Sequence, residues 1–148
     1  MPSSPYTAAK LRTQEAMAEI AKQIGELFIG IPEETYFQEK RICLTPDAVA
    51  AVVANGHRVL VEKGAGEEAG FSDRQYSEAG AEITSETAKV FGCPMILKVE
   101  PPTLEELEMI KPKAVLISAL QLKTRQTSYF KELQRKKLTA VAFEFIKD

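Results

Sequence analysis

The sequence predicts an α/β domain with a doubly wound, mostly parallel sheet flanked by helices, of the Rossmann or flavodoxin-like kind. Short apolar runs alternate with helical stretches along most of the chain, which implies right-handed crossovers between parallel strands. These runs are rich in β-branched residues, as in strands that are buried on both faces. The length of 148 residues matches one domain with a single core.

Residues 1–27 are predicted to form an extra N-terminal helix that precedes a domain of residues 28–148. Its apolar positions recur mainly at spacings of three and four: Leu11, Met17, Ile20, Ala21, Ile24 and Leu27. Charged residues interrupt the segment, and three of them are glutamates, so we exclude a secretory signal or a transit peptide. The apolar stripe needs a partner, either this domain or a neighbouring subunit.

The remaining elements follow in order. The expected strands are residues 27–31, 58–62, 81–83, 94–99, 114–119 and 139–145. The expected helices, with their caps, are residues 45–55, 72–78, 84–91, 103–110 and 124–137. Thr45, Ser72 and Thr103 are the predicted N-caps, and either Thr84 or Ser85 is expected to cap the helix that ends near residue 91. Pro32 ends the first strand because proline has no N–H to donate.

Composition excludes several classes of function. There are 19 basic and 21 acidic residues, a net charge of −2, which argues against an electrostatic partner for nucleic acid. The longest apolar runs, residues 48–54 and 114–119, are too short for membrane insertion. Two cysteines and one histidine exclude a disulfide framework and a histidine-rich metal site. We therefore expect a cytoplasmic domain without a metal.

A glycine-rich stretch after the second strand invites comparison with a dinucleotide-binding fingerprint. It reads Gly64-Ala65-Gly66-Glu67-Glu68-Ala69-Gly70. The third glycine is one position late, two glutamates stand where pyrophosphate would approach, and the next helix begins only after Ser72. We therefore expect a turn that uses glycine for positive φ, and no cofactor-binding residue in this chain.

Candidate site residues follow from the rule that ligands bind beyond the carboxyl ends of parallel strands. The rule selects three loops, residues 32–45, 98–102 and 118–125, with Arg41, Lys98 and Gln121 as their most useful side chains. Arginine offers a planar fork for a carboxylate, and lysine a compact cation that polarises a carbonyl. Lys98 ends an apolar run, so it is either buried for function or extended to solvent from the strand end.

Other polar residues favour structural interpretations. His57 is expected in a surface turn, and both cysteines are expected as partly buried thiols. The acidic residues at 105, 106 and 108 indicate the solvated face of a helix, and the basic residues at 135–137 indicate a helix C-terminus.

Several short motifs are distinctive when taken together: Ile29-Gly30-Ile31-Pro32-Glu33-Glu34, Glu39-Lys40-Arg41-Ile42-Cys43-Leu44-Thr45-Pro46, Asn55-Gly56-His57, Val61-Glu62-Lys63-Gly64-Ala65-Gly66, Ala79-Gly80-Ala81 and Leu97-Lys98-Val99 with Pro102. They closely resemble the opening of the alanine dehydrogenase and proton-translocating transhydrogenase α-subunit family. The resemblance runs from about residue 28 to 145. It implies the N-terminal half of a substrate domain, followed in the family by a separate Rossmann domain that binds NAD. The chain is therefore expected to be a truncated part of a longer enzyme, inactive by itself.

The resemblance also implies roles for three residues. Arg41 corresponds to the arginine that binds the pyruvate or alanine carboxylate, and Lys98 to the lysine that contacts the substrate carbonyl and assists proton transfer. Gln121, in Leu120-Gln121-Leu122, replaces the family histidine that acts as acid and base. Glutamine donates hydrogen bonds but does not exchange protons near neutral pH. The transhydrogenase branch also lacks that histidine.

The leading hypothesis is therefore the substrate-domain portion of an NAD-dependent alanine dehydrogenase-like oxidoreductase. Such an enzyme converts L-alanine, NAD and water to pyruvate, ammonium and NADH, and is expected to be a homo-oligomer that binds a small amino acid or 2-oxo acid. The alternatives are a transhydrogenase α-subunit domain, a saccharopine dehydrogenase relative, and a non-catalytic ligand-binding or assembly module.

Overall fold

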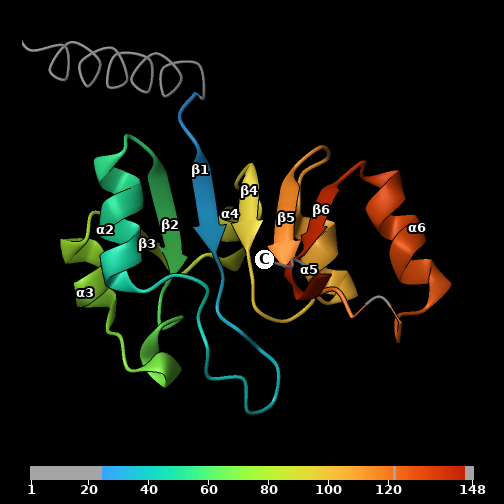
Figure 1. Ribbon diagram of the computed structural model, residues 1–148, viewed down its shortest axis with the longest axis horizontal. Coiled ribbons are helices and arrows are strands. Elements are labelled where there is room, and N and C mark those ends of the chain that lie inside the picture. Colours follow the sequence, from blue (N-terminus) through green and yellow to red (C-terminus); the bar gives the residue numbers. More distant parts are fainter. Residues whose placement is uncertain (1–24, 122, 146–148) are drawn as a thin grey trace, which may run out of the picture.

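The computed structural model describes residues 25–121 and 123–145, and it confirms the doubly wound parallel sheet (Figure 1). The strand order is β3-β2-β1-β4-β5-β6, and every neighbouring pair is parallel. The strands are β1 (Phe28–Ile31), β2 (Arg58–Glu62), β3 (Glu82–Thr84), β4 (Met95–Leu97), β5 (Val115–Ser118) and β6 (Thr139–Ala142). The helices are α2 (Pro46–Ala54), α3 (Asp73–Glu78), α4 (Thr87–Phe91), α5 (Leu104–Met109) and α6 (Thr127–Arg135). Most of the helix predicted within residues 1–27 lies outside the described residues.

Three of the predicted helix caps are confirmed. The Thr45 hydroxyl accepts the N–H of Ala48, and Pro46 opens α2. Ser72 and Thr103 each form a reciprocal capping box, in which the backbone N–H of the cap residue donates to the side-chain oxygen three residues later. Local hydrogen bonding therefore sets where α2, α3 and α5 begin.

The predicted cap of α4 is wrong. Thr84 is the last residue of β3, and its hydroxyl accepts the N–H of Glu86 at 3.1 Å. The helix begins at Thr87 with Glu86 in the cap position, and no side chain caps it. The Thr84 hydroxyl is used in this turn, and the observed cap lies two residues after Thr84 and one after Ser85.

Some predicted elements are longer than the observed ones. The strand expected at residues 94–99 ends at Leu97, and the strand expected at 139–145 ends at Ala142. A single 3₁₀ turn, Phe143–Phe145, follows β6 directly. The helix expected at residues 124–137 spans only Thr127–Arg135. Lys98 and Val99 lie beyond the end of β4, although their backbone hydrogen bonds to Ile117 and Ala119 continue the direction of the strand toward the site described below.

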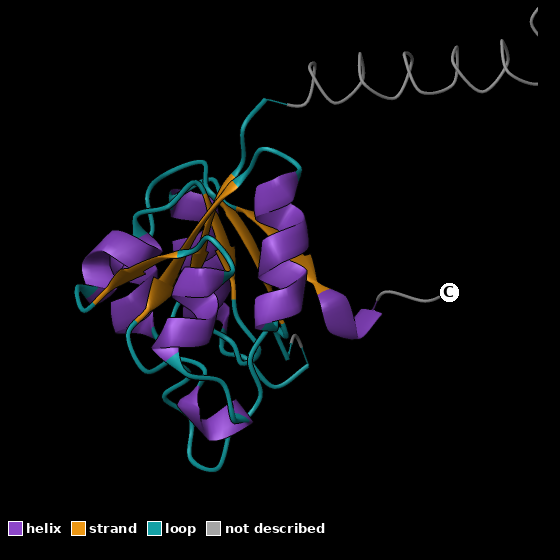
Figure 2. Cartoon of the chain, turned by 90° about the vertical axis from the view of Figure 1, so that its left-hand side faces the viewer, coloured by secondary structure: helices purple, strands orange, loops and turns teal. Residues whose placement is uncertain are grey.

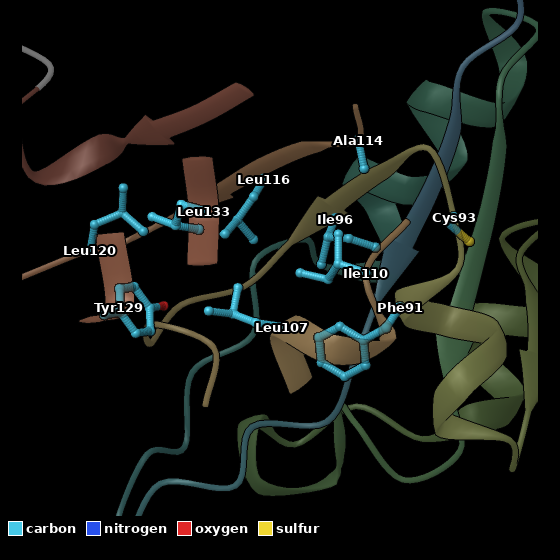
Figure 3. Packing of buried hydrophobic residues seen from close by; sticks show 10 residues of the cluster. All are labelled: Phe91, Cys93, Ile96, Leu107, Ile110, Ala114, Leu116, Leu120, Tyr129 and Leu133. Carbon is cyan, nitrogen blue, oxygen red and sulfur yellow. The ribbon is translucent and has the colours of Figure 1, made fainter. Parts of the chain in front are cut away.

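Helices cover both faces of the sheet (Figure 2). One core lies mainly under α5 and α6, and its buried members are Phe91, Cys93, Ile96, Leu107, Ile110, Ala114, Leu116, Leu120, Tyr129 and Leu133 (Figure 3). The other lies mainly under α2 and α3: Ile29, Ile31, Val49, Val59, Val61, Ala65, Tyr76 and Ala81. Burial of these apolar side chains is the main favourable term for the fold.

The lysine at the C-terminus of α6 also contacts the end of the neighbouring helix α5. Lys136 is buried, and its ammonium donates to the backbone carbonyls of Leu107, Glu108 and Ile110 at the end of α5. Carbonyls at a helix C-terminus have no intrahelical partner and carry partial negative charge, so a cation there is stabilising. Lys136 thereby ties α6 to α5.

The glycine-rich stretch forms a turn, as predicted. Gly64 and Gly70 have φ of +82° and +87°. Gly66 serves a different purpose, since a Cβ there would lie 2.5 Å from the Tyr76 ring and 2.9 Å from the Phe71 carbonyl oxygen. A short 3₁₀ turn, Glu67–Ala69, occupies the place where a nucleotide-binding helix would start. Among the described residues, no helix is long and apolar enough to span a membrane.

Gly30 in the middle of β1 allows α4 to pack closely against the sheet. A Cβ at Gly30 would overlap the carbonyl oxygen of Val90 and lie 3.1 Å from Cβ of Cys93. We expect Gly30→Ala to lower the free energy of unfolding by about 1–3 kcal/mol through overpacking, measured by urea denaturation. Gly25→Ala is the control, because nothing lies within 4 Å of a Cβ there. Equal unfolding midpoints for the two variants would contradict close packing at Gly30.

Candidate functional site

The three loops selected from the sequence meet at the carboxyl edge of the sheet, as predicted. In Figure 1 the loop after β1 continues beyond the tips of the strand arrows. Side-chain contacts join this loop to the other two: Lys98 pairs with Glu34, and Gln121 donates to Glu100, which also lies near Arg41. The predicted residues are thus brought into one cluster, together with carboxylates that the sequence analysis did not assign to it.

Lys98 is fully buried, so the prediction of a lysine extended to solvent is wrong. It follows β4 directly, and its backbone N–H continues the ladder to Ile117 of β5 at 3.0 Å. Its Nζ lies 2.8 Å from Oε2 of Glu34 and 3.9 Å from Oε2 of Glu106. A buried ammonium is costly unless its charge is compensated, and these two carboxylates compensate it.

Glu34 accepts three hydrogen bonds and joins the loop after β1 to the loop after β4. Besides Lys98, it accepts the backbone N–H of Val99 at 2.6 Å and of Glu100 at 3.3 Å. Its side chain is only 6% exposed. Glu34 was missed as a site residue because the sequence reasoning looked for cations in this loop. The sequence signal that could have identified Glu34 is its position, two residues beyond Pro32, which ends the strand.

Glu106 was predicted on a solvated helix face, and this is wrong. Its neighbours Glu105 and Glu108 are exposed, but the Glu106 side chain is 9% exposed and turned toward Lys98. It accepts the backbone N–H of Thr103 at 3.0 Å and the Thr35 hydroxyl at 3.4 Å. The capping box that begins α5 therefore also holds a carboxylate at the site.

Arg41 lies at the outer edge of the cluster and already binds a carboxylate. Its side chain is 70% exposed, and its Nε and Nη2 donate to the two oxygens of Glu39 at 2.9 and 2.7 Å. The backbone N–H of Arg41 donates to the same carboxylate at 2.8 Å. The hydrogen bond from the guanidinium lowers the pKa of Glu39 to about 2. Arg41 thus binds a carboxylate through two hydrogen bonds, as expected of an arginine. In this structure the carboxylate is that of Glu39.

Glu100 links Arg41 to Gln121. Its Oε1 lies 3.7 Å from Nη2 of Arg41, and its Oε2 accepts from Nε2 of Gln121 at 3.1 Å. Burial, followed by the hydrogen bond with Glu39 and the charge of Glu39, raises the pKa of Glu100. The cluster therefore has more acidic than basic groups, with four carboxylates around Arg41 and Lys98.

Gln121 is held by its backbone as well as by its side chain. It has φ of +50°, and its N–H donates to Glu144 at 2.8 Å, as does the N–H of Leu120 at 2.9 Å. Burial alone would raise the pKa of Glu144, but these backbone hydrogen bonds outweigh it and lower the pKa. Glu144 comes from the 3₁₀ turn after β6, a turn that the sequence reasoning had assigned to a strand.

Cys43 and His57, which were also considered in the sequence analysis, supply no reactive group to this cluster. Burial raises the pKa of the Cys43 thiol to about 12, so it stays protonated and unreactive. His57 stands before β2, at the opposite end of the strands, where its Nδ1 accepts the N–H of Leu27. Within residues 25–121 and 123–145, no group of three or more His, Cys, Asp or Glu side chains could hold a metal ion.

Comparisons with known proteins identify relatives over most of the chain. The family model "Alanine dehydrogenase/PNT, N-terminal domain" matches residues 30–148. Alanine dehydrogenase of Bacillus subtilis (strain 168) is 38% identical over 122 residues, which are 82% of this chain and 32% of that protein. Alanine dehydrogenase 2 of Staphylococcus aureus (strain USA300) is 40% identical over 118 residues, 80% of this chain and 32% of that protein. The chain thus spans about a third of the length of these relatives.

Solved structures agree with the sequence comparison. An L-alanine dehydrogenase superposes with a TM-score of 0.76 at 34% identity, covering 80% of this chain and 32% of that one. A transhydrogenase from Sinorhizobium meliloti superposes with a TM-score of 0.75 at 26% identity, covering 81% of this chain and 36% of that one. Both matches fall on the doubly wound sheet described above.

The buried pair of Lys98 and Glu34 leads to a stability prediction. Glu34→Ala leaves a buried ammonium without its nearest partner, and we expect it to lower the free energy of unfolding by about 3–5 kcal/mol. Urea denaturation measures the change, and Glu33→Ala, at an exposed neighbour, is the matched control. The double variant Glu34→Ala/Lys98→Met should recover part of the loss, because the unpaired charge is gone. A loss below about 1 kcal/mol for Glu34→Ala would show that the pair does not hold the loop.

Proposed function

Because the chain belongs to the alanine dehydrogenase/PNT N-terminal domain family, we propose that it is the substrate-domain portion of an alanine dehydrogenase-like oxidoreductase. The observation that carries the proposal is the meeting of Arg41, Lys98 and Gln121 at one edge of the sheet. The proposed reaction of the whole enzyme converts L-alanine, NAD⁺ and water to pyruvate, ammonium, NADH and a proton. We place this enzyme in the cytoplasm as a homo-oligomer.

Each of the three residues has a role that its chemistry supports. The Arg41 guanidinium would bind the substrate carboxylate through two parallel hydrogen bonds. The Lys98 ammonium would donate to the carbonyl oxygen of the 2-oxo acid, drawing electron density from C2 and making that carbon more electrophilic. The Gln121 amide would add a neutral hydrogen bond. Lys98 is fully buried behind Glu34, so substrate contact requires side chains of the 32–45 loop to move.

The described residues do not fit NAD. The glycine-rich turn runs into Glu67 and Glu68, and Gly66 packs against Tyr76 and is not open to a phosphate. The proposal therefore assigns the nicotinamide cofactor to a domain other than this one. The residues described here bind and polarise the substrate only.

A transhydrogenase domain is the second candidate, and Gln121 favours it. Glutamine cannot supply the proton exchange that amino-acid oxidation requires, whereas hydride exchange between two nicotinamides needs no such group at this place. A non-catalytic ligand-binding module would keep Arg41 and make no use of Lys98. The proposed function and the non-catalytic module differ in one respect: only the first requires the site to bind a carboxylate with a neighbouring carbonyl more tightly than a carboxylate without one.

Binding of pyruvate and propionate to the 148-residue chain tests the proposal, because propionate has the carboxylate without the carbonyl. NMR titration should show tighter binding of pyruvate. We expect Arg41→Lys to weaken both ligands about five-fold, since a point charge replaces the fork. Lys98→Met should reduce pyruvate affinity to that of propionate, while Lys111→Met, at an exposed lysine, should change nothing.

Two results would contradict the proposal. Equal affinity of the parent chain for pyruvate and propionate would mean that Lys98 does not recognise a carbonyl, which favours the non-catalytic module. Micromolar binding of NAD to the same chain, measured by calorimetry, would show that the cofactor site lies within these residues.

Replacing Gln121 tests its place beside the substrate. We expect Gln121→His to make pyruvate binding pH-dependent relative to the parent, because a protonated imidazole donates a charged hydrogen bond. The gain should be present below a pH of about 6.5 and lost as the pH rises through the histidine pKa. The ratio of variant to parent dissociation constants, measured from pH 5 to 8, gives the profile. A ratio that stays constant over this range would remove Gln121 from the ligand site.

A further inference from the structure

The two cations of the site are held by their carboxylate partners with very different firmness. Lys98 and Glu34 are buried together, and Glu34 is fixed by two further backbone hydrogen bonds. The Arg41 side chain is 70% exposed, although that of Glu39 is only 8% exposed, so water reaches this pair from the arginine side. The first pair is therefore the harder of the two to open. In the second pair the guanidinium faces solvent, where another carboxylate can approach it.

The bond between Arg41 and Glu39 has the geometry that a ligand carboxylate would adopt. Both carboxylate oxygens are engaged, one by Nε and the other by Nη2. This is the two-point arrangement through which arginine recognises carboxylates. Glu100 stands 3.7 Å from the same Nη2 and adds a second negative charge on that side. A ligand carboxylate cannot use this edge of the guanidinium while Glu39 occupies it.

We infer that Glu39 is an internal competitor for the ligand carboxylate at Arg41, and that ligand binding exchanges one carboxylate for the other. The inference rests on the proposed role of Arg41 and makes Glu39 a residue that sets the affinity of the site for carboxylates. It acts through Arg41, without touching the ligand once displaced. The chain thus supplies its own carboxylate partner for the more exposed of the two cations in the site.

The loop that carries Glu39 is fixed at both ends and exposed between them, which allows the exchange. Glu34 anchors its start, and the Tyr76 hydroxyl holds the Leu44 carbonyl at its end at 2.8 Å. Phe37 is 90% exposed at the tip, and Gln38 has a left-handed φ of +63°. The turn that contains Gln38 is closed by a hydrogen bond from the backbone N–H of Glu39 to the Tyr36 carbonyl at 3.1 Å, which does not involve the Glu39 carboxylate. Exchange at Arg41 therefore requires neither the turn nor the ends of the loop to open.

Removing the competitor should tighten carboxylate binding. We expect Glu39→Gln in the 148-residue chain to lower the dissociation constants of pyruvate and propionate about two- to five-fold, measured by NMR titration. Glu105→Gln removes the same charge from the exposed side of α5 and should leave both constants unchanged. Unchanged or weaker carboxylate binding by Glu39→Gln would overturn the inference.

A direct observation of Glu39 separates exchange from a purely structural role. At pH 7, where Glu39 and propionate are both ionised, the side-chain carboxyl carbon of Glu39 should change its chemical shift on saturation with propionate, because Arg41 has passed to the ligand. The carboxyl carbon of Glu105, on the exposed side of α5, should not change. A Glu39 carboxyl signal that propionate does not move would also overturn the inference.

The two proposals fail in different ways. If Glu39→Gln tightens propionate and pyruvate equally, and the parent does not distinguish them, the exchange stands and the proposed function falls. If the parent prefers pyruvate but Glu39→Gln gives no gain for either ligand, the proposed function stands and the exchange falls.

Discussion

The arrangement of the site depends on one buried ion pair, that of Lys98 with Glu34. The lysine ends the apolar segment of β4, and the glutamate belongs to the loop after β1, so their contact joins two neighbouring strands beyond the last ladder bond. An ammonium without exposure to solvent requires compensation, and this requirement fixes how the 32–45 loop lies across the sheet edge. Once that loop is placed, Arg41 comes to lie near Glu100, and Glu100 meets Gln121. Without the pair, the three loops would share an edge but no common geometry.

The charges of the site explain why both of its cations already have carboxylate partners when no ligand is bound. Carboxylates outnumber the cations Arg41 and Lys98, and each cation is in contact with at least one of them. An incoming anion therefore meets occupied partners and must displace one. The two partners differ because burial amplifies electrostatic interactions and exposure weakens them. The two carboxylates are similarly buried, so the difference between the pairs lies in the cations, with Lys98 fully buried and Arg41 largely exposed.

Much of the fold was predictable because it depends on local signals. Thr45, Ser72 and Thr103 begin helices through bonds to residues three positions away, and such bonds can be inferred from the sequence. The parallel sheet followed from alternation, and with it the edge where Arg41, Lys98 and Gln121 lie. What could not be predicted depends on partners distant in the chain. Glu106 is 71 residues from Thr35, and Glu144 is 23 residues from Gln121. Nothing in a helix pattern distinguishes Glu106 from the exposed Glu105, because the reason for its burial is the position of Lys98.

The 3₁₀ turn after β6 has a mechanical consequence. Its Glu144 carboxylate accepts the backbone N–H groups of both Leu120 and Gln121, so a single side chain joins the turn at the end of β6 to the turn beyond β5. A displacement of residues 143–145 would therefore change the position of the Gln121 amide. The sixth strand, at the edge of the sheet, is in this way connected to the candidate site.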